Sequence, residues 1–455
     1  MTASSSLVAQ LTRIFGADCS TDPAECLAYG YDNSRRQAQP DAVVFPTTHE
    51  QTVALVQACR SAKTALTVRG RGTNTTGATV PVAGGVVASL ERMNRIVRID
   101  PDNRLAIVEP GVLNGDLQAA LADHGFFWPP DPTSSPFCTI GGNLACNAAG
   151  PRAVKYGSCR ENVLGLRAVT GYGEAFDCGV YTTKGATGYD LTRLMIGSEG
   201  TLAVITRATL KITPRPAAKR TLRATYTDVA AAAAAVARIM AQPITPCALE
   251  FLDGQSLQLA REYGGAAIAE GGAMLIVEVD GAEDQVVDAA QAIAQSANGS
   301  GALEVRIATN NDDVATLWAA RKALSPALRT LSPNKINEDV VVPVSRLPEL
   351  IDSLGEISRK HQIDIVGFGH AGNGNIHVNL LPRDDAQRKR AEQALVDVFD
   401  TVIKLDGTLS GEHGIGLAKR DFLSRALDPV ALELMRRIKR QFDPDGILNP
   451  GKLLP

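Results

Sequence analysis

Hydrophobic and polar positions follow two different orders on either side of Pro214-Arg-Pro216. Before this break, short apolar runs alternate with amphipathic segments, which predicts strands at 42–45, 66–68, 85–90, 96–99, 105–109 and 163–170 and helices at 7–15, 49–62 and 114–124. After the break, the pattern predicts strands at 222–226, 248–252, 274–280, 303–308 and 339–344 and helices at 228–241, 282–296, 312–324, 347–361 and 384–405. We therefore place a domain boundary at the prolines and expect the second part to be α+β with a largely antiparallel sheet.

Length and composition narrow the class of protein. Single hydrophobic cores stop growing at roughly 250–300 residues, so 455 residues with a 45% hydrophobic content predict a globular protein of more than one domain. The net charge of −3 and the lack of a basic block argue against a nucleic-acid-binding protein. The eight cysteines form no Cys-x-x-Cys pair, which is typical of reduced thiols in a cytoplasmic protein.

Neither secretion nor membrane insertion is indicated. Residues 1–6 lack the basic and apolar regions of a secretion signal. The longest apolar run, 229–237, is mostly alanine and is far shorter than the ~20 residues that cross a membrane. Asp228 precedes this run as a candidate N-cap, so we predict an ordinary helix here and a cytoplasmic location for the chain.

Candidate chemistry is concentrated in residues 367–379, where two apolar runs flank a turn rich in glycine and asparagine. This pattern predicts a strand, a tight turn and a second strand. Side chains alternate along a strand, so His377 and Asn379 are expected on one face, and His370 at the mouth of the turn can bend back towards His377. The common alternative is that such histidines are ordinary core residues. Their clustering and the four glycines nearby favour a site instead.

The segment Ser410–Gly416 adds a carboxylate and a third histidine to these candidates. His370, His377 and Glu412 form a set of two imidazoles and one carboxylate that leaves coordination positions open, as in catalytic zinc sites. Mn²⁺ or Fe²⁺ would also accept these ligands. His413, next to the carboxylate, is then available for proton transfer.

Three stretches rich in glycine precede the proline break. The first, Arg69–Gly77, contains Gly-x-Gly but lacks the following helix and the acidic residue of a dinucleotide-binding Rossmann turn. Its glycines and hydroxyls are suited instead to a pyrophosphate bound by backbone N–H groups, the alternative being a mobile surface loop. The second stretch spans 129–150 and the third 197–201, and we interpret both as polar loops. Together the three predict a long ligand with phosphates and a ring system.

These segments resemble one flavoprotein family. The first three motifs are similar to the FAD-binding domain of the vanillyl-alcohol oxidase/PCMH superfamily, and they lie at 69–73, 140–147 and 188–201. The last three resemble the branch that contains D-lactate dehydrogenase, D-2-hydroxyglutarate dehydrogenase and the glycolate oxidase catalytic subunit, and they lie at 370–377, 412–416 and 442–451. All six occur in the family's order, and the resemblance covers the chain from about residue 41 to residue 455.

The resemblance implies an α+β protein with a PCMH-type FAD-binding domain at 1–215, a cap domain for substrate and metal at 216–410, and a segment at 411–455 that returns to the FAD domain. It implies FAD contacts by Arg69, Gly70, Arg71, Gly72, Thr73, Asn74, Gly77, Pro130, Thr133, Gly141, Gly142, Asn143, Asn147, Gly150, Tyr156, Gly157, Glu199, Gly200, Thr201, Ile205 and Asn449. Some relatives tether FAD through a histidine in the first loop. Residues 69–77 contain none, so we expect noncovalent FAD. A thioether at Cys138 or Cys146 is the alternative to buried structural thiols there.

The resemblance also implies an activity, the oxidation of a D-2-hydroxy acid with hydride transfer to flavin N5. A divalent metal, usually zinc in the relatives, would chelate the substrate, and His413 would accept the hydroxyl proton. The implied substrate-binding residues are Arg321, Ser325, Lys335, Asn379 and His413. Because two cations can hold a distal carboxylate, we favour D-2-hydroxyglutarate over D-lactate. For Arg321 the alternative is a solvated helix face.

Two other classes fit part of the pattern. A zinc hydrolase fits the metal ligands but leaves the three glycine-rich stretches without a ligand. A flavin-binding subunit of a multi-protein redox complex, acting on D-lactate or glycolate, fits both features. Each redox interpretation requires an electron acceptor, such as a flavoprotein, a quinone or a dye. The relatives are commonly dimers, so we expect a homodimer.

Overall fold

The computed structural model describes residues 4–264 and 270–455 and divides into two compact units. The first unit contains the described residues of Met1–Ala149 together with Gly157–Arg215 and Glu412–Pro455. The second contains Gly150–Tyr156 and the described residues of Pro216–Gly411. Compared with the division expected from the sequence, the return to the first unit begins one residue later, and the short segment at 150–156 moves to the second unit. Of residues 1–6, in which no secretion signal is expected, the first three lie outside the described residues.

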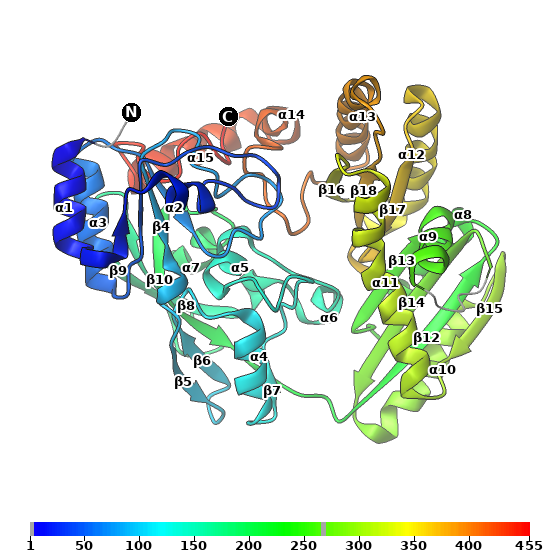
Figure 1. Ribbon diagram of the computed structural model, residues 1–455. Coiled ribbons are helices and arrows are strands. Elements are labelled where there is room, and N and C mark those ends of the chain that lie inside the picture. The colour runs from blue at the N-terminus through cyan, green and yellow to red at the C-terminus, as the bar shows by residue number, and fades with distance from the viewer. Residues whose placement is uncertain (1–3, 265–269) are drawn as a thin grey trace. The chain divides into compact units, whose positions relative to one another are not determined.

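The N-terminal part of the first unit is built on a four-stranded sheet. Its order is β1-β2-β4-β3, and only β1 runs antiparallel to its neighbour. The strands are β1 (Cys19–Ser20), β2 (Ala42–Val44), β3 (Leu66–Arg69) and β4 (Val86–Ser89). Helices α1 (Ser5–Phe15) and α3 (His49–Ser61) lie side by side (Figure 1) and share one buried apolar cluster with the sheet.

A five-stranded antiparallel sheet forms the second core of this unit, in the order β5-β6-β10-β8-β9. Its strands are β5 (Ile96–Asp100), β6 (Leu105–Val108), β8 (Val163–Thr170), β9 (Ala175–Gly179) and β10 (Ala203–Lys211). The helices that pack on its apolar cluster are α4 (Asn114–Ala122), α5 (Ile140–Cys146), α7 (Leu191–Met195) and α15 (Pro429–Phe442). A small pair, β7 (Phe126–Phe127) and β11 (Thr213–Pro214), completes the unit's strands among the described residues.

The prediction of a loop at 129–150 is wrong for its C-terminal part, because residues 140–146 form α5. Thr139 caps this helix, and its hydroxyl accepts a hydrogen bond from the Gly142 amide (3.2 Å). The side chain of Leu144 is fully buried, and this packing overrides the weak helix propensity of the two glycines. The helix ends at Asn147, which adopts a left-handed φ of 54°.

Two further helices of more than ten residues were missed by the sequence pattern, α9 (Gly254–Gly264) and α15. The start of α15 had a recognisable signal. Asp428 accepts hydrogen bonds from the amides of Val430 (2.9 Å) and Ala431 (3.0 Å), and Pro429 takes the first helical position. This Asp-Pro pair ahead of an amphipathic run is a sequence-level indication of a helix N-terminus.

The second unit contains a seven-stranded sheet whose pairs are all antiparallel, in the order β15-β12-β14-β13-β17-β18-β16. This confirms the α+β prediction. The strands are β12 (Ala218–Tyr226), β13 (Ala248–Asp253), β14 (Ala273–Gly281), β15 (Ala302–Ile307), β16 (Ile336–Val341), β17 (Ile365–Gly369) and β18 (Asn375–Leu380).

Helices cover both faces of this sheet. On one face the Tyr226 hydroxyl donates to the Ala297 carbonyl (2.8 Å) at the end of α10 (Glu283–Ala297), and α8 (Val229–Ala241), α12 (Leu347–His361) and α13 (Asp385–Lys404) continue this layer. Figure 1 shows α12 and α13 side by side. On the other face α9 packs with α11 (Asn311–Leu331) over an apolar cluster that includes Leu252, Ile276 and Phe368. The functional candidates of this unit lie on the α11 face.

Helix α11 extends beyond its predicted end at residue 324. A residue before a proline disfavours the helical conformation, and Ser325 is followed by Pro326. In the structure Pro326 lies inside the helix. Ala327 and Leu328 are buried, so packing against the sheet keeps the helix intact although the proline donates no hydrogen bond.

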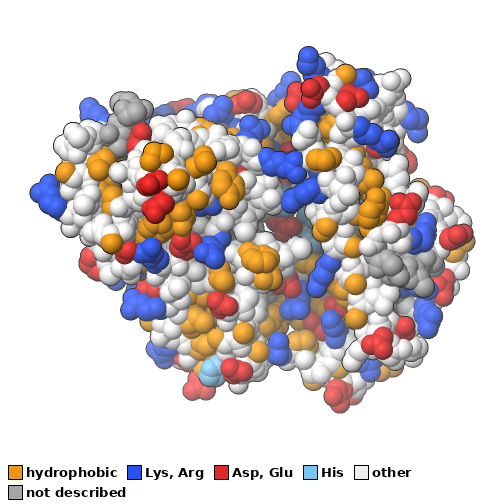
Figure 2. Space-filling model, in the orientation of Figure 1, with side chains coloured by type: hydrophobic (Ala, Val, Ile, Leu, Met, Phe, Trp, Pro, Cys, Tyr) orange, Lys and Arg blue, Asp and Glu red, His pale blue; other side chains and the backbone are white. Residues whose placement is uncertain are grey.

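Charged side chains of both signs are mixed over the face of each unit shown in Figure 2. Within the described residues, no helix has both the length and the apolar character needed to cross a membrane. All eight cysteines lie in the described ranges and none of them forms a disulfide, as expected from their spacing.

The predicted hairpin at 367–379 is confirmed as β17, a short turn at Ala371–Asn373 and β18. Gly374 closes the turn with a φ of +74°. A Cβ atom at this position would lie 1.9 Å from the Val342 carbonyl oxygen. Both the backbone conformation and the close approach therefore require glycine.

We expect Gly374→Ala to lower the stability of the second unit by about 2 kcal/mol or more, because it adds a steric clash to the strain of a left-handed residue. Gly188→Ala is the matched control, since Gly188 has a φ of +76° and open space around it. Thermal unfolding of both variants measures the difference. Equal losses would contradict a role for the contact with Val342.

Candidate functional site

The antiparallel register of β17 and β18 brings two histidines together. Phe368 of β17 lies opposite His377 of β18, and His370 follows the end of β17 directly. The rings of His370 and His377 are 5.2 Å apart between centroids and nearly perpendicular, and both side chains are buried. The Phe368 ring lies 5.7 Å from that of His377 and closes one side of the pair.

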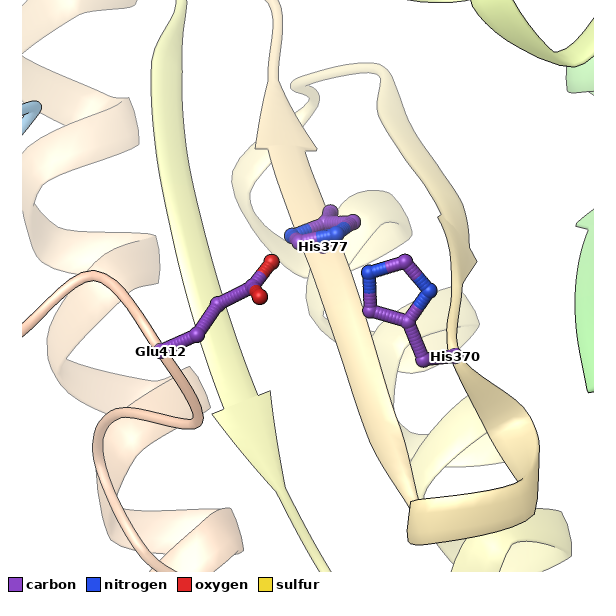
Figure 3. Close-up of side chains that lie close together, drawn as sticks. All are labelled: His370, His377 and Glu412. Carbon is purple, nitrogen blue, oxygen red and sulfur yellow. The ribbon is translucent and has the colours of Figure 1, made fainter. Parts of the chain in front are cut away.

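A carboxylate reaches the two imidazoles from the segment that follows the second unit. The Gly411 amide donates to Asp339 Oδ2 (2.8 Å), and the Ser410 hydroxyl donates to the same carboxylate (3.2 Å). Glu412 is the next residue, and its carboxylate points towards the imidazoles of His370 and His377 (Figure 3). One ligand atom from each of the three residues lies within 4.8 Å of the others. Two imidazoles and one carboxylate are donors suited to a catalytic divalent cation, so the predicted ligand set fits a metal.

Glu250 was not predicted as a functional residue, although it contacts this site directly. Its Oε1 is hydrogen-bonded to His370 Nδ1, and its Oε2 accepts from Arg321 Nε (2.7 Å). Burial raises the pKa of Glu250, but His370 and Arg321 outweigh that effect and hold the pKa below its usual range. The sequence did contain a signal for this residue, because Glu250 is the one acid in the apolar run at 248–252. A charge in a buried strand is normally paired, which indicates a partner inside the protein.

The solvated-face alternative for Arg321 is wrong. Its side chain is 12% exposed, its Nε is paired with Glu250, and its guanidinium lies 4.6 Å from the centre of the Phe368 ring. Ser325 lies one helical turn further along α11 and is exposed. Arg321 and His377 thus lie beside the ring of Phe368, and the ring of His370 lies beside that of His377.

Lys335 and Asn379 are brought together as a pair. The Lys335 ammonium donates to Asn379 Oδ1 (2.6 Å), and the amide of Asn379 donates to the His377 carbonyl (3.2 Å). Asn379 is fully buried and lies two residues from His377 on the same side of β18. The predicted same-face arrangement of Asn379 and His377 is therefore confirmed, and it places a cation beside them.

The segment that carries His413 is held by two residues of the first unit. Asn74 donates its amide N–H to the His413 carbonyl (2.9 Å). The carboxylate of Glu199 accepts hydrogen bonds from the amides of Ile415 (2.6 Å) and Gly416 (2.8 Å). These contacts place His413 between the glycine-rich loop at 69–77 and the Gly197–Thr201 turn.

The predicted cofactor motifs converge within the first unit, although they are far apart in the sequence. The Gly197 amide donates to the Leu144 carbonyl (2.9 Å), and the Glu199 amide donates to the Ala145 carbonyl (2.8 Å). The side chain of Asn449 donates to the carbonyls of Ala78 (2.9 Å) and Glu199 (2.6 Å). Four segments from the two ends and the middle of the chain therefore meet, as a single extended ligand would require.

Several predicted cofactor residues contact the protein through their side chains. Arg69 donates to the Tyr31 carbonyl (2.5 Å), Arg71 pairs with Glu91 (2.7 Å), and Asn147 accepts from the Ser158 hydroxyl (2.9 Å). These groups shape the surrounding segments. They leave backbone atoms as the natural contacts for a pyrophosphate in the first loop.

Tyr156, which is predicted as a cofactor contact, belongs to the second unit. Its hydroxyl donates to Asp280 Oδ2 (2.8 Å), and Lys155 pairs with the same carboxylate. Gly150 begins this segment, and Gly157, with a φ of +78°, is the point where the chain returns to the first unit.

Comparison with protein families matches residues 40–179 to an "FAD binding domain" and residues 215–453 to "FAD linked oxidases, C-terminal domain". Among curated proteins, the glycolate oxidase subunit GlcD of Bacillus subtilis is 37% identical over 449 residues, with 98% of this chain and 96% of that protein covered. The D-lactate dehydrogenase of Anaerostipes hadrus is 34% identical and covers 92% of this chain and 90% of its own length.

A D-2-hydroxyglutarate dehydrogenase of Stutzerimonas stutzeri is 32% identical, with 95% of each chain covered. Among solved structures, p-cresol methylhydroxylase with substrate bound has a TM-score of 0.82 at 18% identity, covering 98% of this chain and 96% of that chain. This structural likeness supports the PCMH-type fold.

We expect Glu412→Gln to weaken Zn²⁺ binding on the order of 100-fold, because an ionised ligand is replaced by a neutral amide. Isothermal titration with Zn²⁺ and with Mn²⁺ measures the loss. His124→Gln is the control, since His124 is exposed and outside the cluster. Unchanged stoichiometry and affinity in Glu412→Gln would show that the cluster does not bind the metal.

Burial raises the pKa of Glu199 from 4.5 to about 7, although the Ile415 and Gly416 amides and two lysines lower it. The folded protein therefore binds more protons here than the unfolded chain between about pH 4.5 and pH 7, and stability falls as the pH rises through this window. The difference is on the order of 3 kcal/mol. We expect Glu199→Gln to show a smaller drop in melting temperature between pH 5 and pH 8 than the parent. The same drop in both proteins would contradict this assignment.

Proposed function

Because this chain belongs to the family of FAD-linked oxidases, we propose that it oxidises a D-2-hydroxy acid to the 2-oxo acid, with D-2-hydroxyglutarate and D-lactate as the first acids to test. The observation that carries the proposal is the cluster of His370, His377 and Glu412, with ligand atoms within 4.8 Å, in a chain of this family. A cation at this cluster can bind a hydroxyl and a neighbouring carboxylate together, which is the feature that 2-hydroxy acids share.

The cofactor residues of the first unit support noncovalent FAD. The loop at 69–77 offers backbone N–H groups, and it contains no histidine for a covalent tether. The turn at Gly197–Thr201 and the segment around Asn449 lie against each other through the bond from Asn449 to the Glu199 carbonyl. We assign these segments to the pyrophosphate and the flavin.

When bound, FAD would accept the α-hydride of the hydroxy acid, and a divalent cation would lower the pKa of the substrate hydroxyl. His413 is the group that we assign to accept the hydroxyl proton, since it follows the ligand Glu412 directly in the chain. Asn74 and Glu199 fix the backbone around His413, so the imidazole starts from a defined position. The products are a 2-oxo acid, reduced flavin and a proton on His413.

We assign the orientation of the substrate to the polar side chains on the sheet face that α11 covers. Asn379 and Lys335 are bonded to each other and lie beside His377, where they can receive a substrate carboxylate. Arg321 keeps its two terminal amino groups for a carboxylate, because its bond to Glu250 uses Nε. We assign Ser325, one turn along the helix, as an additional hydroxyl donor to the substrate.

A second candidate function is a catalytic subunit that passes electrons to partner proteins. The observation that favours it is the 37% identity with a protein whose name includes the word "subunit". The two functions differ in turnover. A self-sufficient dehydrogenase reduces an added dye or quinone over many turnovers, with the acid as electron donor. A subunit reduces its bound flavin once and does not turn over again without its partner protein.

The decisive experiment is anaerobic mixing of the FAD-loaded protein with D-2-hydroxyglutarate, D-lactate, L-lactate and glycolate, each with and without prior chelation. We expect one D-acid to bleach the flavin absorbance, the bleaching to be lost with chelator, and Zn²⁺ or Mn²⁺ to restore it. His413→Asn should slow bleaching about 10²–10⁴-fold, the usual contribution of a general base. Bleaching that survives chelation would overturn the metal role, and no bleaching by any acid would overturn the proposed activity.

We expect Lys335→Met to raise KM about 10–100-fold for D-2-hydroxyglutarate, because a hydrogen bond to a charged group contributes about 1.5–3 kcal/mol. KM for D-lactate should change little if Lys335 holds the distal carboxylate, since D-lactate has none. Steady-state kinetics with both acids measures the two values. Equal losses for both acids would assign Lys335 to the carboxylate that all 2-hydroxy acids share.

A further inference from the structure

We infer that Glu250 is a positioning residue that couples metal binding to substrate recognition, by holding the metal ligand His370 with one oxygen and the substrate-binding Arg321 with the other. This inference rests on the proposed function for its substrate half only. Glu250 lies in β13, in the middle of the sheet, and its side chain is 1% exposed. Both of its oxygens are used, Oε1 by His370 and Oε2 by Arg321.

The contact with His370 selects which ring nitrogen can bind a metal. A carboxylate that accepts the Nδ1 proton leaves the lone pair on Nε2, and it also fixes the rotation of the ring. His370 follows the last residue of β17, where the backbone leaves the sheet. The contact from β13 holds the side chain at this position beside His377.

The contact with Arg321 determines the direction of the guanidinium. Its Nε is held by Glu250 (2.7 Å), and its Cζ lies over the ring of Phe368, 4.6 Å from the ring centroid. These two contacts limit the orientations that the terminal amino groups can adopt. Because Arg321 is 12% exposed, loss of Glu250 would leave a nearly buried cation without this acid.

Glu278 provides an internal control on the same face of the sheet. It lies opposite Ala248, two residues from Glu250, and is similarly buried. It anchors the same helix, since Trp318 of α11 donates its indole N–H to Glu278 (2.7 Å) three residues before Arg321. Its other partners are Thr221 (2.9 Å) and Lys219 (2.9 Å). Like Glu250, it is therefore a buried acid of the sheet that is bonded to α11, but His370 is not among these partners.

The test measures the dissociation constant of Zn²⁺ by titration of the FAD-loaded protein, with no turnover involved. We expect Glu250→Gln to weaken Zn²⁺ binding about 10–100-fold, the usual effect of removing the carboxylate behind a metal-bound histidine. Glu278→Gln should leave the affinity within about threefold of the parent, since the partners of Glu278 named above do not include His370. Arg321→Met should also leave the Zn²⁺ affinity within about threefold of the parent, because Glu250 still holds His370.

The double variant Glu250→Gln/Arg321→Met covers the case in which Glu250→Gln does not fold, since it removes both members of the buried pair. We expect it to lose Zn²⁺ affinity as the single Glu250 variant does. With metal saturating, Glu250→Gln and Arg321→Met should both raise KM for the reacting D-acid about tenfold with a smaller change in kcat, the sign of lost substrate binding.

Unchanged Zn²⁺ affinity in the Glu250 variants would overturn the inference. An equal loss in Glu278→Gln would also overturn it, because it would show a general effect of the sheet rather than orientation of His370. If no 2-hydroxy acid reacts but Zn²⁺ affinity falls only in the Glu250 variants, the proposed substrate is wrong and the positioning of His370 stands. The two failures are therefore distinguishable.

Discussion

The antiparallel pairing of β17 with β18 is the constraint on which the candidate centre depends. A tight turn joins the two strands, so residues on either side of it face each other at a fixed register, with Phe368 opposite His377. His370 follows β17 and is therefore held 5.2 Å from His377, ring to ring. The turn requires a glycine at 374, because any Cβ there would meet the Val342 carbonyl. A shift of one residue in this register would move His377 to the opposite face of the sheet.

The electrostatics of the centre follow from burial. Removing a charged group from water costs free energy, so a buried charge needs partners. Glu250 has two of them, His370 and Arg321. Asp339 performs a related task at the next strand pair, where it accepts hydrogen bonds from Ser410 and Gly411 just before Glu412. In this way two buried acids outside the cluster of His370, His377 and Glu412 hold residues of the cluster or residues next to it.

The segment that carries His413 is held by residues that belong to the predicted cofactor motifs of the first unit. Asn74 binds the carbonyl of His413, Glu199 binds the amide of Ile415, and Asn449 binds the Glu199 carbonyl. The glycine-rich motifs therefore serve two purposes in the proposed enzyme. Their backbone is available for FAD, and their side chains fix the proton acceptor.

The sequence alone determined the features that local physics controls. The hairpin, the domain break at Pro214-Arg-Pro216 and most strands follow from periodicity and from turn residues, and the motifs were sufficient to indicate the family. Local rules failed where packing outweighs propensity, as in α5 with its two glycines and in α11 with Pro326 inside it.

Only the tertiary structure revealed the partners of the site residues. Glu250 and His370 are 120 positions apart, and Asp339 and Gly411 are 72 apart, so no local pattern connects them. The solvated-face alternative for Arg321 was open in the sequence because an arginine on a helix is usually exposed. The sheet order β14-β13-β17-β18 decided it, since that order places the acid of β13 beside the histidine after β17 and beneath α11. Contacts of this kind depend on which strands become neighbours, and that is settled by the packing of the whole sheet.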